Sequence, residues 1–195
     1  MPAITGLREG RRGSVAIELD GEPWRTLPVD VVVRAGLALG GELDRPRLRD
    51  LGRELRRTKA LSRATRALAV RDLSRRSLDE RLRQAGVAQR ERSEALDTLA
   101  RAGLVDDERF ACGRAHALSD RGFGDAAIRW HLEREGVDAG LVERALAELE
   151  PERERAERIA ENRGRTAATA RFLARKGFAD DAVEAVVGAD AGAGA

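Results

Sequence analysis

A motif with helical spacing occurs three times along this chain and constrains its fold more than any other feature. Each copy has two further positions at four-residue intervals after its first residue, and then a glycine four residues later. Residues four apart lie on one helix face, and a following glycine ends the helix because it adopts the left-handed conformation at little cost. The copies are Ser74, Leu78, Leu82, Gly86; then Gly124, Ile128, Leu132, Gly136; and then Arg165, Thr169, Leu173, Gly177.

Apolar residues at matching positions outside the motif enlarge each copy into a three-helix unit. They lie six residues before the motif and ten residues after its glycine: Leu68, Leu118 and Ile159, and then Leu96, Leu146 and Val187. Repeats of this size stack on their neighbours, because none buries a core alone. The sequence therefore predicts a mainly α protein in which three tandem three-helix repeats form an elongated curved array. Such an array functions through a surface rather than a deep pocket.

Residues 1–43 have a different pattern, which predicts a small β-hairpin/α module before the repeats. Residues 14–19 alternate apolar and polar side chains, as a half-buried strand does. Asp20-Gly21 then supplies a hairpin turn. Residues 4–7 and 23–27 are the candidate partner strands.

Two prolines indicate where the first helices begin. Pro28 favours a short helix ending at Gly36, although three consecutive valines between them favour a strand, and we interpret the segment as a helix. Pro46 starts a helix that carries leucines at helical spacing. The repeats predict further helices near residues 60–72, 75–85, 90–102, 107–120, 125–135, 139–149, 152–163, 166–176 and 179–187.

These elements divide the chain into five segments. The strand-rich module and a basic linker helix occupy residues 1–56. The repeats occupy residues 57–105, 106–150 and 151–188. Residues 189–195 contain only Ala, Gly and one Asp, so we expect a disordered tail whose deletion changes neither folding nor binding.

The composition favours a reducing compartment. Cys112 is the only cysteine, so no intramolecular disulfide forms, and the N-terminus lacks the apolar segment of a signal peptide. We therefore expect a cytoplasmic protein. Of the 36 basic residues 34 are arginine. Arginine makes bidentate contacts with phosphates and carboxylates, but we attribute the excess itself to codon usage, because arginines occur along the whole chain.

Charge is distributed unevenly, with a basic segment ahead of an acidic one. Residues 45–83 contain 14 Arg or Lys against 5 Asp or Glu, a net charge of +9, whereas residues 94–195 have 15 against 21, a net charge of −6. A basic block with so few acids repels itself unless an anion faces it, although a solvated helix face is the simpler interpretation. The candidate partner-binding or DNA-binding residues are Arg53, Arg56, Arg57, Lys59, Arg63, Arg71, Arg75, Arg76 and Trp130.

The densest cluster of potentially reactive side chains lies at residues 106–111 and has a structural interpretation. We expect Asp107 to cap a helix and Phe110 to point into the core. No His or Cys ligand set accompanies the paired carboxylates, so no metal site is expected. The sequence contains no phosphate-binding glycine loop and no nucleophile motif. We predict neither an enzyme nor a cofactor.

Three single side chains have both structural and functional interpretations. His116 falls in mid-helix, where we expect partial burial. Cys112 in the same helix is better read as small core filler than as a nucleophile, since no partner base can be argued. Trp130 is a groove-facing residue or an edge of the core.

Taken together, these residues resemble the RecX family of bacterial recombination regulators over residues 60–188. The resemblance is most specific in the second repeat, where Gly103-Leu104-Val105-Asp106-Asp107-Glu108-Arg109-Phe110-Ala111 matches a signature of that family. Two positions depart from the family pattern. Ser77 replaces an acidic residue, which weakens a helix cap, and Thr169 replaces an aliphatic residue, which loosens the third repeat.

The resemblance implies three tandem three-helix units and a monomeric, non-enzymatic regulator. Its implied partners are RecA and the RecA-DNA nucleoprotein filament, with inhibition of recombinase, ATPase and coprotease activity, in DNA repair and the SOS response. Two alternatives remain open on the residues alone. One is a sequence-tolerant DNA-binding regulator, and the other is a scaffold repeat protein with another protein partner.

Overall fold

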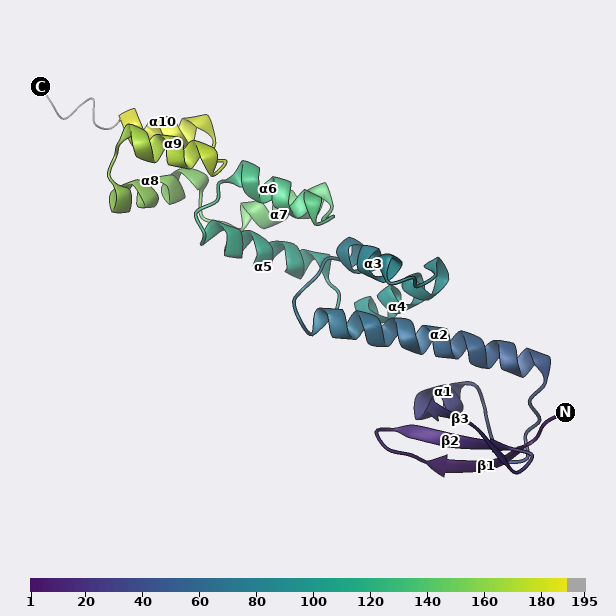
Figure 1. Ribbon diagram of the computed structural model, residues 1–195. Helices are drawn as coiled ribbons and strands as arrows, with labels where there is room; N and C mark the ends of the chain where they lie inside the picture. Colours follow the sequence, from purple (N-terminus) through teal and green to yellow (C-terminus); the bar gives the residue numbers. More distant parts are fainter. Residues whose placement is uncertain (189–195) are drawn as a thin grey trace, which may run out of the picture. The chain divides into compact units, whose positions relative to one another are not determined.

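The computed structural model describes residues 1–188, which form ten helices and one small antiparallel sheet (Figure 1). The mainly α fold class is as predicted, and the tail predicted at residues 189–195 lies outside the described residues. The strands are β1 Ile4–Glu9, β2 Ser14–Leu19 and β3 Glu22–Pro28. The helices are α1 Val29–Arg34, α2 Arg45–Leu68, α3 Arg75–Gln84, α4 Gln89–Arg101, α5 Asp107–Ser119, α6 Asp125–Arg134, α7 Ala139–Ala147, α8 Glu152–Arg163, α9 Ala167–Arg175 and α10 Asp180–Gly188.

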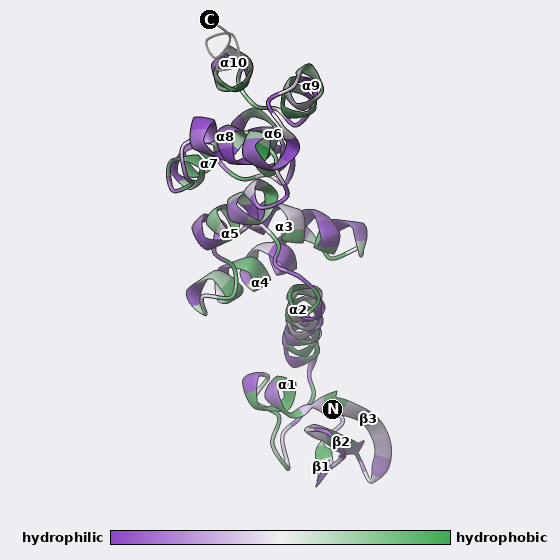
Figure 2. Cartoon of the chain, turned by 90° about the vertical axis from the view of Figure 1, so that its left-hand side faces the viewer, coloured by the Kyte–Doolittle hydropathy of each residue, from purple (hydrophilic) through white to green (hydrophobic). Residues whose placement is uncertain are grey.

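The chain divides into two compact units, and the division passes through α3 and α4. The first unit contains Met1–Ala67 and Leu82–Asp97, and the second contains Leu68–Arg81 and the chain from Thr98 onward. Most helices carry both hydrophilic and hydrophobic stretches (Figure 2). Among the described residues, no helix is long and apolar enough to cross a membrane.

The first unit begins with the predicted hairpin. The strands pair antiparallel in the order β1-β2-β3, with Val15 opposite Leu27 in the β2–β3 register. Asp20 and Gly21 both have positive φ, 48° and 86°, as the tight turn between twisted strands requires. The sheet, α1 and the start of α2 share one core; its buried members are Ile4, Val15, Ile17, Leu27, Val31, Val32, Leu37, Leu43 and Leu51.

Helix α2 differs from the prediction, which separated a linker helix from a repeat helix at residues 60–72. The structure joins them into one helix of 24 residues that ends at Leu68. No proline follows Pro46 within this segment, and the single Gly52 costs only about 1 kcal/mol against alanine. Its buried residues change from Leu51 near the start to a later stripe of small side chains, Ala60, Ala64 and Ala67.

The second unit contains two complete three-helix sets with separate cores. Helices α5–α7 enclose Ile128 and Leu132, both with 0% exposure, and α8–α10 enclose Leu173 and Phe178. Thr169 is buried in the third repeat, and its hydroxyl donates to the Gly164 carbonyl at 2.7 Å. The polar group is therefore satisfied inside the core, and the expected loosening of the third repeat stays a prediction.

The motif glycines share a left-handed backbone but differ in their surroundings. Gly86, Gly136 and Gly177 have φ of 73°, 82° and 80°. A Cβ on Gly177 would lie 2.7 Å from Ala127 backbone nitrogen, whereas no described atom lies within 4 Å of a Cβ on Gly86. A Cβ on Gly136 would collide with the side chain of Arg76, which can move. The third glycine is therefore required for packing as well as for conformation.

We predict that Gly177→Ala lowers the free energy of unfolding more than Gly86→Ala does. Both variants place alanine in a left-handed conformation, which costs about 1–2 kcal/mol. Gly177→Ala adds overpacking against Ala127 backbone, for a further ~1–3 kcal/mol. Urea unfolding of both variants measures the difference, with Gly136→Ala expected between them. Equal losses at Gly86 and Gly177 would contradict this close approach.

Candidate functional site

The amino-terminal end of α3 is held by groups of the second repeat. The Ser74 hydroxyl donates to the Glu135 carbonyl, and the Ser77 hydroxyl donates to the same oxygen at 2.9 Å. Ser74 also accepts from the Ser77 backbone N–H at 3.1 Å, so it caps its own helix. Ser77 therefore has a role between repeats, although it lacks the carboxylate expected at its position.

The two aspartates of the signature have separate capping roles, and the prediction for Asp107 is wrong. Asp106 is the N-cap of α5, with its carboxylate accepting from the Glu108 and Arg109 N–H groups at 3.0 Å. The Asp107 carboxylate instead accepts from the Arg75 backbone N–H at 2.7 Å, at the first residue of α3. Asp107 thus stabilises the start of a helix that lies 32 residues earlier in the chain.

The amino-terminal end of α6 is held by the third repeat in the same way. Gly124 N–H donates to the Lys176 carbonyl at 2.9 Å, and Ala126 N–H donates to the Gly177 carbonyl at 3.2 Å. A carboxylate oxygen of Glu152 accepts from the Asp125 N–H at 2.5 Å. A Cβ on Gly124 would collide with the backbone of Gly177, which explains why no side-chain cap occupies this position.

A buried arginine completes this second contact between repeats. Arg155 is 3% exposed and donates to the Asp125 carboxylate, to the Phe123 carbonyl at 3.0 Å and to the Glu150 carbonyl at 2.9 Å. A buried charge is tolerated when it is paired and hydrogen-bonded in this way. Arg155 therefore ties the third repeat to the second.

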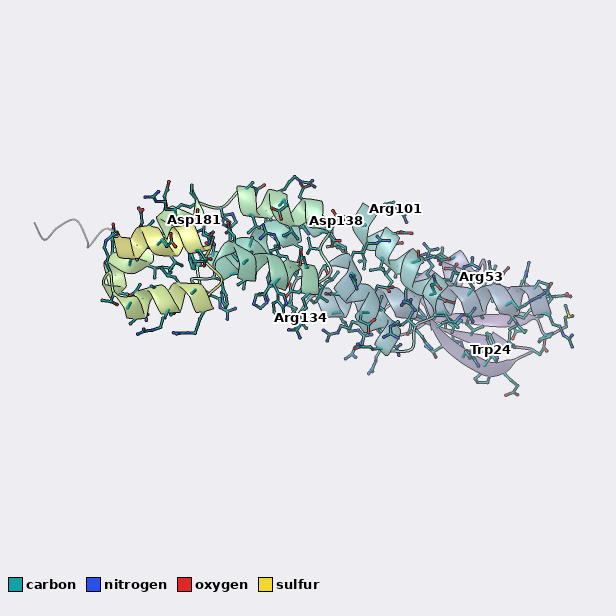
Figure 3. The ribbon with its side chains drawn as sticks, turned by 90° about the horizontal axis from the view of Figure 1, so that it is seen from above. Trp24, Arg53, Arg101, Arg134, Asp138 and Asp181 are labelled. Atoms are coloured by element: carbon teal, nitrogen blue, oxygen red, sulfur yellow. The ribbon has the colours of Figure 1, made fainter. Side chains whose placement is uncertain are left out.

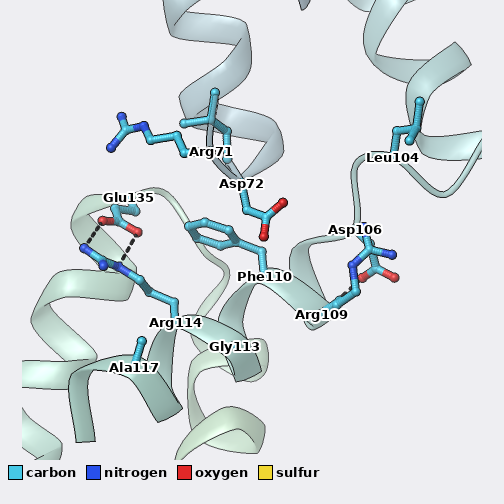
Figure 4. A pocket seen from close by; sticks show the side chains of 11 residues that line it. Arg71, Asp72, Leu104, Asp106, Arg109, Phe110, Gly113, Arg114, Ala117 and Glu135 are labelled. Carbon is cyan, nitrogen blue, oxygen red and sulfur yellow. Dashed lines mark hydrogen bonds and ion pairs between the residues drawn. The ribbon is translucent and has the colours of Figure 1, made fainter. Parts of the chain in front are cut away.

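A cleft of about 400 Å³ lies beside the contact between α3 and the second repeat (Figure 4). Phe110 lies at the centre of the cleft, and Arg71 and Asp72 line the wall above it in the view of Figure 4. Arg114 and Glu135 close one end through a two-pronged ion pair at 2.8 and 3.2 Å. The remaining lining residues are Leu73, Leu104, Asp106, Arg109, Gly113 and Ala117.

Phe110 is half-buried, which corrects the prediction that it points into the core. It packs against the core of the second repeat and also lines the cleft. The buried face of α5 runs instead through Ala111, Ala115 and Leu118. Phe110 is one residue away from that face and therefore lies at its edge.

Several residues of the basic block have partners in the first unit. Arg56 pairs with the buried carboxylate of Glu91 at 2.9 Å, and Arg63 donates to the Ala85 carbonyl at 2.9 Å. Arg53, labelled in Figure 3, pairs with Asp50 at 2.7 Å. Among the described residues, Arg57 and Lys59 have neither an ion pair nor a side-chain hydrogen bond.

In the second unit, the predicted binding residues occupy separate places. Arg71 lines the cleft, and Arg75 and Arg76 lie at the start of α3, where Arg76 covers Gly136. Trp130 is 53% exposed on α6, which excludes the interpretation as a core edge. Within the second unit, the structure therefore places these four residues at the cleft, at the start of α3 and on the surface of α6.

The remaining single residues do not form a reactive centre. His116 is exposed, contrary to the prediction, because it lies off the buried face of α5. Burial and a hydrogen bond with Glu148 raise the pKa of the Cys112 thiol, which disfavours the nucleophilic thiolate. Among the described residues, no three His, Cys, Asp or Glu side chains group as metal ligands.

Comparison with known proteins places this repeat architecture in one family. Residues 106–146 match the family model described as RecX, second three-helix domain. A regulatory protein RecX of Acidithiobacillus ferrooxidans is 33% identical over 138 residues, covering 65% of this chain and 87% of that protein. The chain belongs to the RecX family.

Other RecX proteins match to different extents. A regulatory protein RecX of Mycolicibacterium smegmatis is 38% identical over 98 residues. The matched region covers 52% of that protein, so the chain spans about half the length of this relative. A crystal structure of regulatory protein RecX superposes with a TM-score of 0.81 at 21% identity, over 97% of this chain and 100% of the other. The crystal structure of RecX from Lactobacillus salivarius superposes with a TM-score of 0.60 at 20% identity, over 69% of this chain and 96% of the other. These structures confirm the fold.

Sequence reasoning missed the residues that join the repeats. Glu135 and Lys176 accept hydrogen bonds through their backbone carbonyls, and a residue of any type could do so, so the sequence does not identify them. Glu152 and Arg155 looked like ordinary helix-surface charges. One signal was available for Arg155, since it lies four residues before Ile159 and so shares a helix face with an apolar residue.

We predict that Phe110→Ala destabilises the protein less than Phe178→Ala. Phe178 is 5% exposed, and truncating such a side chain costs about 3–5 kcal/mol. Phe110 is half-buried, so we expect about 2 kcal/mol. Thermal and urea unfolding compare the two variants. A loss at Phe110 equal to that at Phe178 would show that Phe110 belongs to the core.

We predict a pH-dependent contribution from the Arg56–Glu91 pair. A hydrogen bond from Arg56 lowers the pKa of the Glu91 carboxyl, so its stabilisation is present above the unfolded-state pKa and is lost as pH falls through the folded-state value. The stability difference between the unmodified protein and Glu91→Gln should be at most about 1 kcal/mol at pH 7, because Arg56 is exposed. Urea unfolding between pH 7 and 3 should show this difference shrinking below about pH 4.5, whereas Glu9→Gln on the exposed part of β1 should show little effect. A difference that persists at pH 3 would refute the assignment.

Proposed function

We propose that this protein binds RecA and its filament on DNA and inhibits recombinase, ATPase and coprotease activity. The observation that carries the proposal is the Asp106–Ala111 signature, which falls inside the region matching the second RecX domain. The named relatives are regulatory proteins. The proposal includes monomeric action in the cytoplasm without a cofactor.

The proposal assigns partner contact to the repeats and to the basic linker helix. We keep the segments 57–105, 106–150 and 151–188 as the repeating functional modules, with residues 1–56 as a separate module. The repeats bury most of their motif residues in their cores, and backbone groups at the ends of their helices hydrogen-bond to the neighbouring repeat. The remaining faces of the repeats are therefore open to a partner. Several weak contacts along a filament would add through linkage.

A second candidate is direct, sequence-tolerant contact of the basic block with DNA phosphates. It is favoured by Arg57 and Lys59, whose charges have no carboxylate partner among the described residues. Arg56 is a poor test residue, because its removal leaves the buried Glu91 carboxylate unpaired. The test therefore targets Arg57 and Lys59 alone.

We predict that the protein suppresses the DNA-dependent ATPase of RecA filaments and that Arg57→Glu with Lys59→Glu weakens this effect. The matched control is Arg11→Glu with Arg34→Glu, which makes the same charge change on exposed residues of the first unit. The control should inhibit like the unmodified protein. If a several-fold molar excess of unmodified protein leaves both ATPase and strand exchange unchanged, the proposed function is wrong.

Binding assays separate the two candidates. If the block contacts phosphates, Arg57→Glu with Lys59→Glu should weaken binding to naked DNA. The slope of the logarithm of the binding constant against the logarithm of the salt concentration should also become less steep, by about 0.9 per lost contact on duplex. Contact with an acidic protein surface should leave naked-DNA binding unchanged while filament binding falls. No response in either assay would identify the block as a solvated helix face.

A further inference from the structure

Aromatic rings and cations form a continuous row of contacts across the second and third repeats. The row begins with Arg134, whose guanidinium lies 5.0 Å from the centroid of the Trp130 ring. Trp130 meets His131 edge-on at 4.9 Å, and His131 meets Phe123 at 5.5 Å. These contacts lie within the second repeat and cover the start and the outer face of α6.

The row continues across the contact between repeats through Lys176. Its ammonium lies 3.8 Å from the centroid of the Phe123 ring and 5.8 Å from that of Phe172. Arg163 then covers Phe172 at 4.2 Å, and Arg121 covers Phe123 at 5.5 Å. Lys176 therefore links the rings of two repeats, beside the carbonyl groups that join their backbones.

The cations of this row are available to an anion. Among the described residues, Arg121, Arg134 and Lys176 form no ion pair with a carboxylate. Figure 3 shows Arg134 projecting from the edge of the second repeat. Helix α9 adds Arg171 and Arg175 on its exposed side and contains no acidic residue.

The acidic residues nearby are few, and two are already engaged. The Asp125 carboxylate accepts from Arg155, and the Glu135 carboxylate accepts from Arg114. Asp120 and Glu133 are the exposed acids closest in sequence to the row. The row is thus locally basic within a segment of the chain that is acidic in total.

We propose that this row is a binding site for single-stranded nucleic acid. Bases of any sequence stack on aromatic side chains, while flanking cations contact the backbone phosphates. Trp130 is 53% exposed and offers the stacking surface, and Arg134, Arg121 and Lys176 offer the phosphate contacts. A duplex keeps its bases stacked on each other, so it cannot use the rings.

An acidic peptide is the competing ligand, and the rings argue against it. Carboxylates would pair with the cations but would leave the exposed tryptophan unused. The site is separate from the basic block of α2, and the proposal does not depend on RecA. Its test therefore contains no recombinase and can fail or succeed independently of the proposed function.

Tryptophan fluorescence reports the stacking directly. The chain has two tryptophans, so Trp24→Phe leaves Trp130 as the only one. Adding oligothymidylate to the full-length Trp24→Phe protein should quench its fluorescence in a saturable way. The matched Trp130→Phe protein, which retains Trp24 in β3, should show no saturable quenching.

Affinity measurements on variants complete the test. Trp130→Ala should lower the affinity for oligothymidylate by roughly 5- to 150-fold, since each stacked base contributes about 1–3 kcal/mol. Trp24→Ala should leave it unchanged. Arg134→Glu should weaken binding to oligothymidylate and should make the log–log dependence of the binding constant on salt concentration less steep by about 0.7, the value for one lost phosphate contact on a single strand.

Three results would overturn the proposal. They are a loss of duplex affinity in the Trp130→Ala protein as large as its loss of single-strand affinity, displacement of the single strand by polyglutamate at equal charge concentration, and an unchanged affinity in a folded Trp130→Ala protein. Circular dichroism establishes that this variant is folded. The second result would assign the row to an acidic protein partner.

Discussion

The repeats of the second unit depend on hydrogen bonds between the ends of their central helices. A helix start leaves backbone N–H groups without partners inside the helix. At α6 these groups donate to the Lys176 and Gly177 carbonyls at the end of α9 and to Glu152 at the start of α8. At α3 the Asp107 carboxylate has that function, and serine hydroxyls reach the end of α6. Each repeat thus completes the secondary structure of the one before it, as nearest-neighbour stacking in repeat proteins requires.

The parts of the fold that follow from periodicity were predictable, whereas the contacts between repeats were not. Four-residue spacing and glycine identified the central helices, because Leu78, Ile128 and Leu173 have to face a core. The role of Asp107 could not be read from the sequence, since a carboxylate at a helix start caps either its own helix or a neighbouring one. Helix α2 was divided in error because its buried face changes along its length, from Leu51 to the alanine stripe.

The candidate binding surfaces differ in how far the fold already uses their charges. Arg56 and Arg63 of the basic block serve the first unit itself, which leaves Arg57 and Lys59 for a ligand. In the row on α6 and α9, the cations contact rings rather than carboxylates. A ring carries no net charge, so a cation held over it is not neutralised, whereas a cation in an ion pair is. Counting arginines in the sequence could not make this distinction.

Helix α9 has a different start from α3 and α6, and this limits how the series of repeats can grow. The Thr166 hydroxyl accepts from the Thr169 N–H, and the Thr169 hydroxyl donates to the Gly164 carbonyl. At the position that corresponds to Asp125 of α6, the Thr166 N–H donates to the Gly164 carbonyl at 3.0 Å, so this donor is satisfied within the third repeat. A fourth module grafted behind the third with a counterpart of Glu152 would therefore meet a donor that is already engaged. Extension of the array would require the turn between Gly164 and Thr166 to open, so the third repeat is less ready than the second to accept a following module.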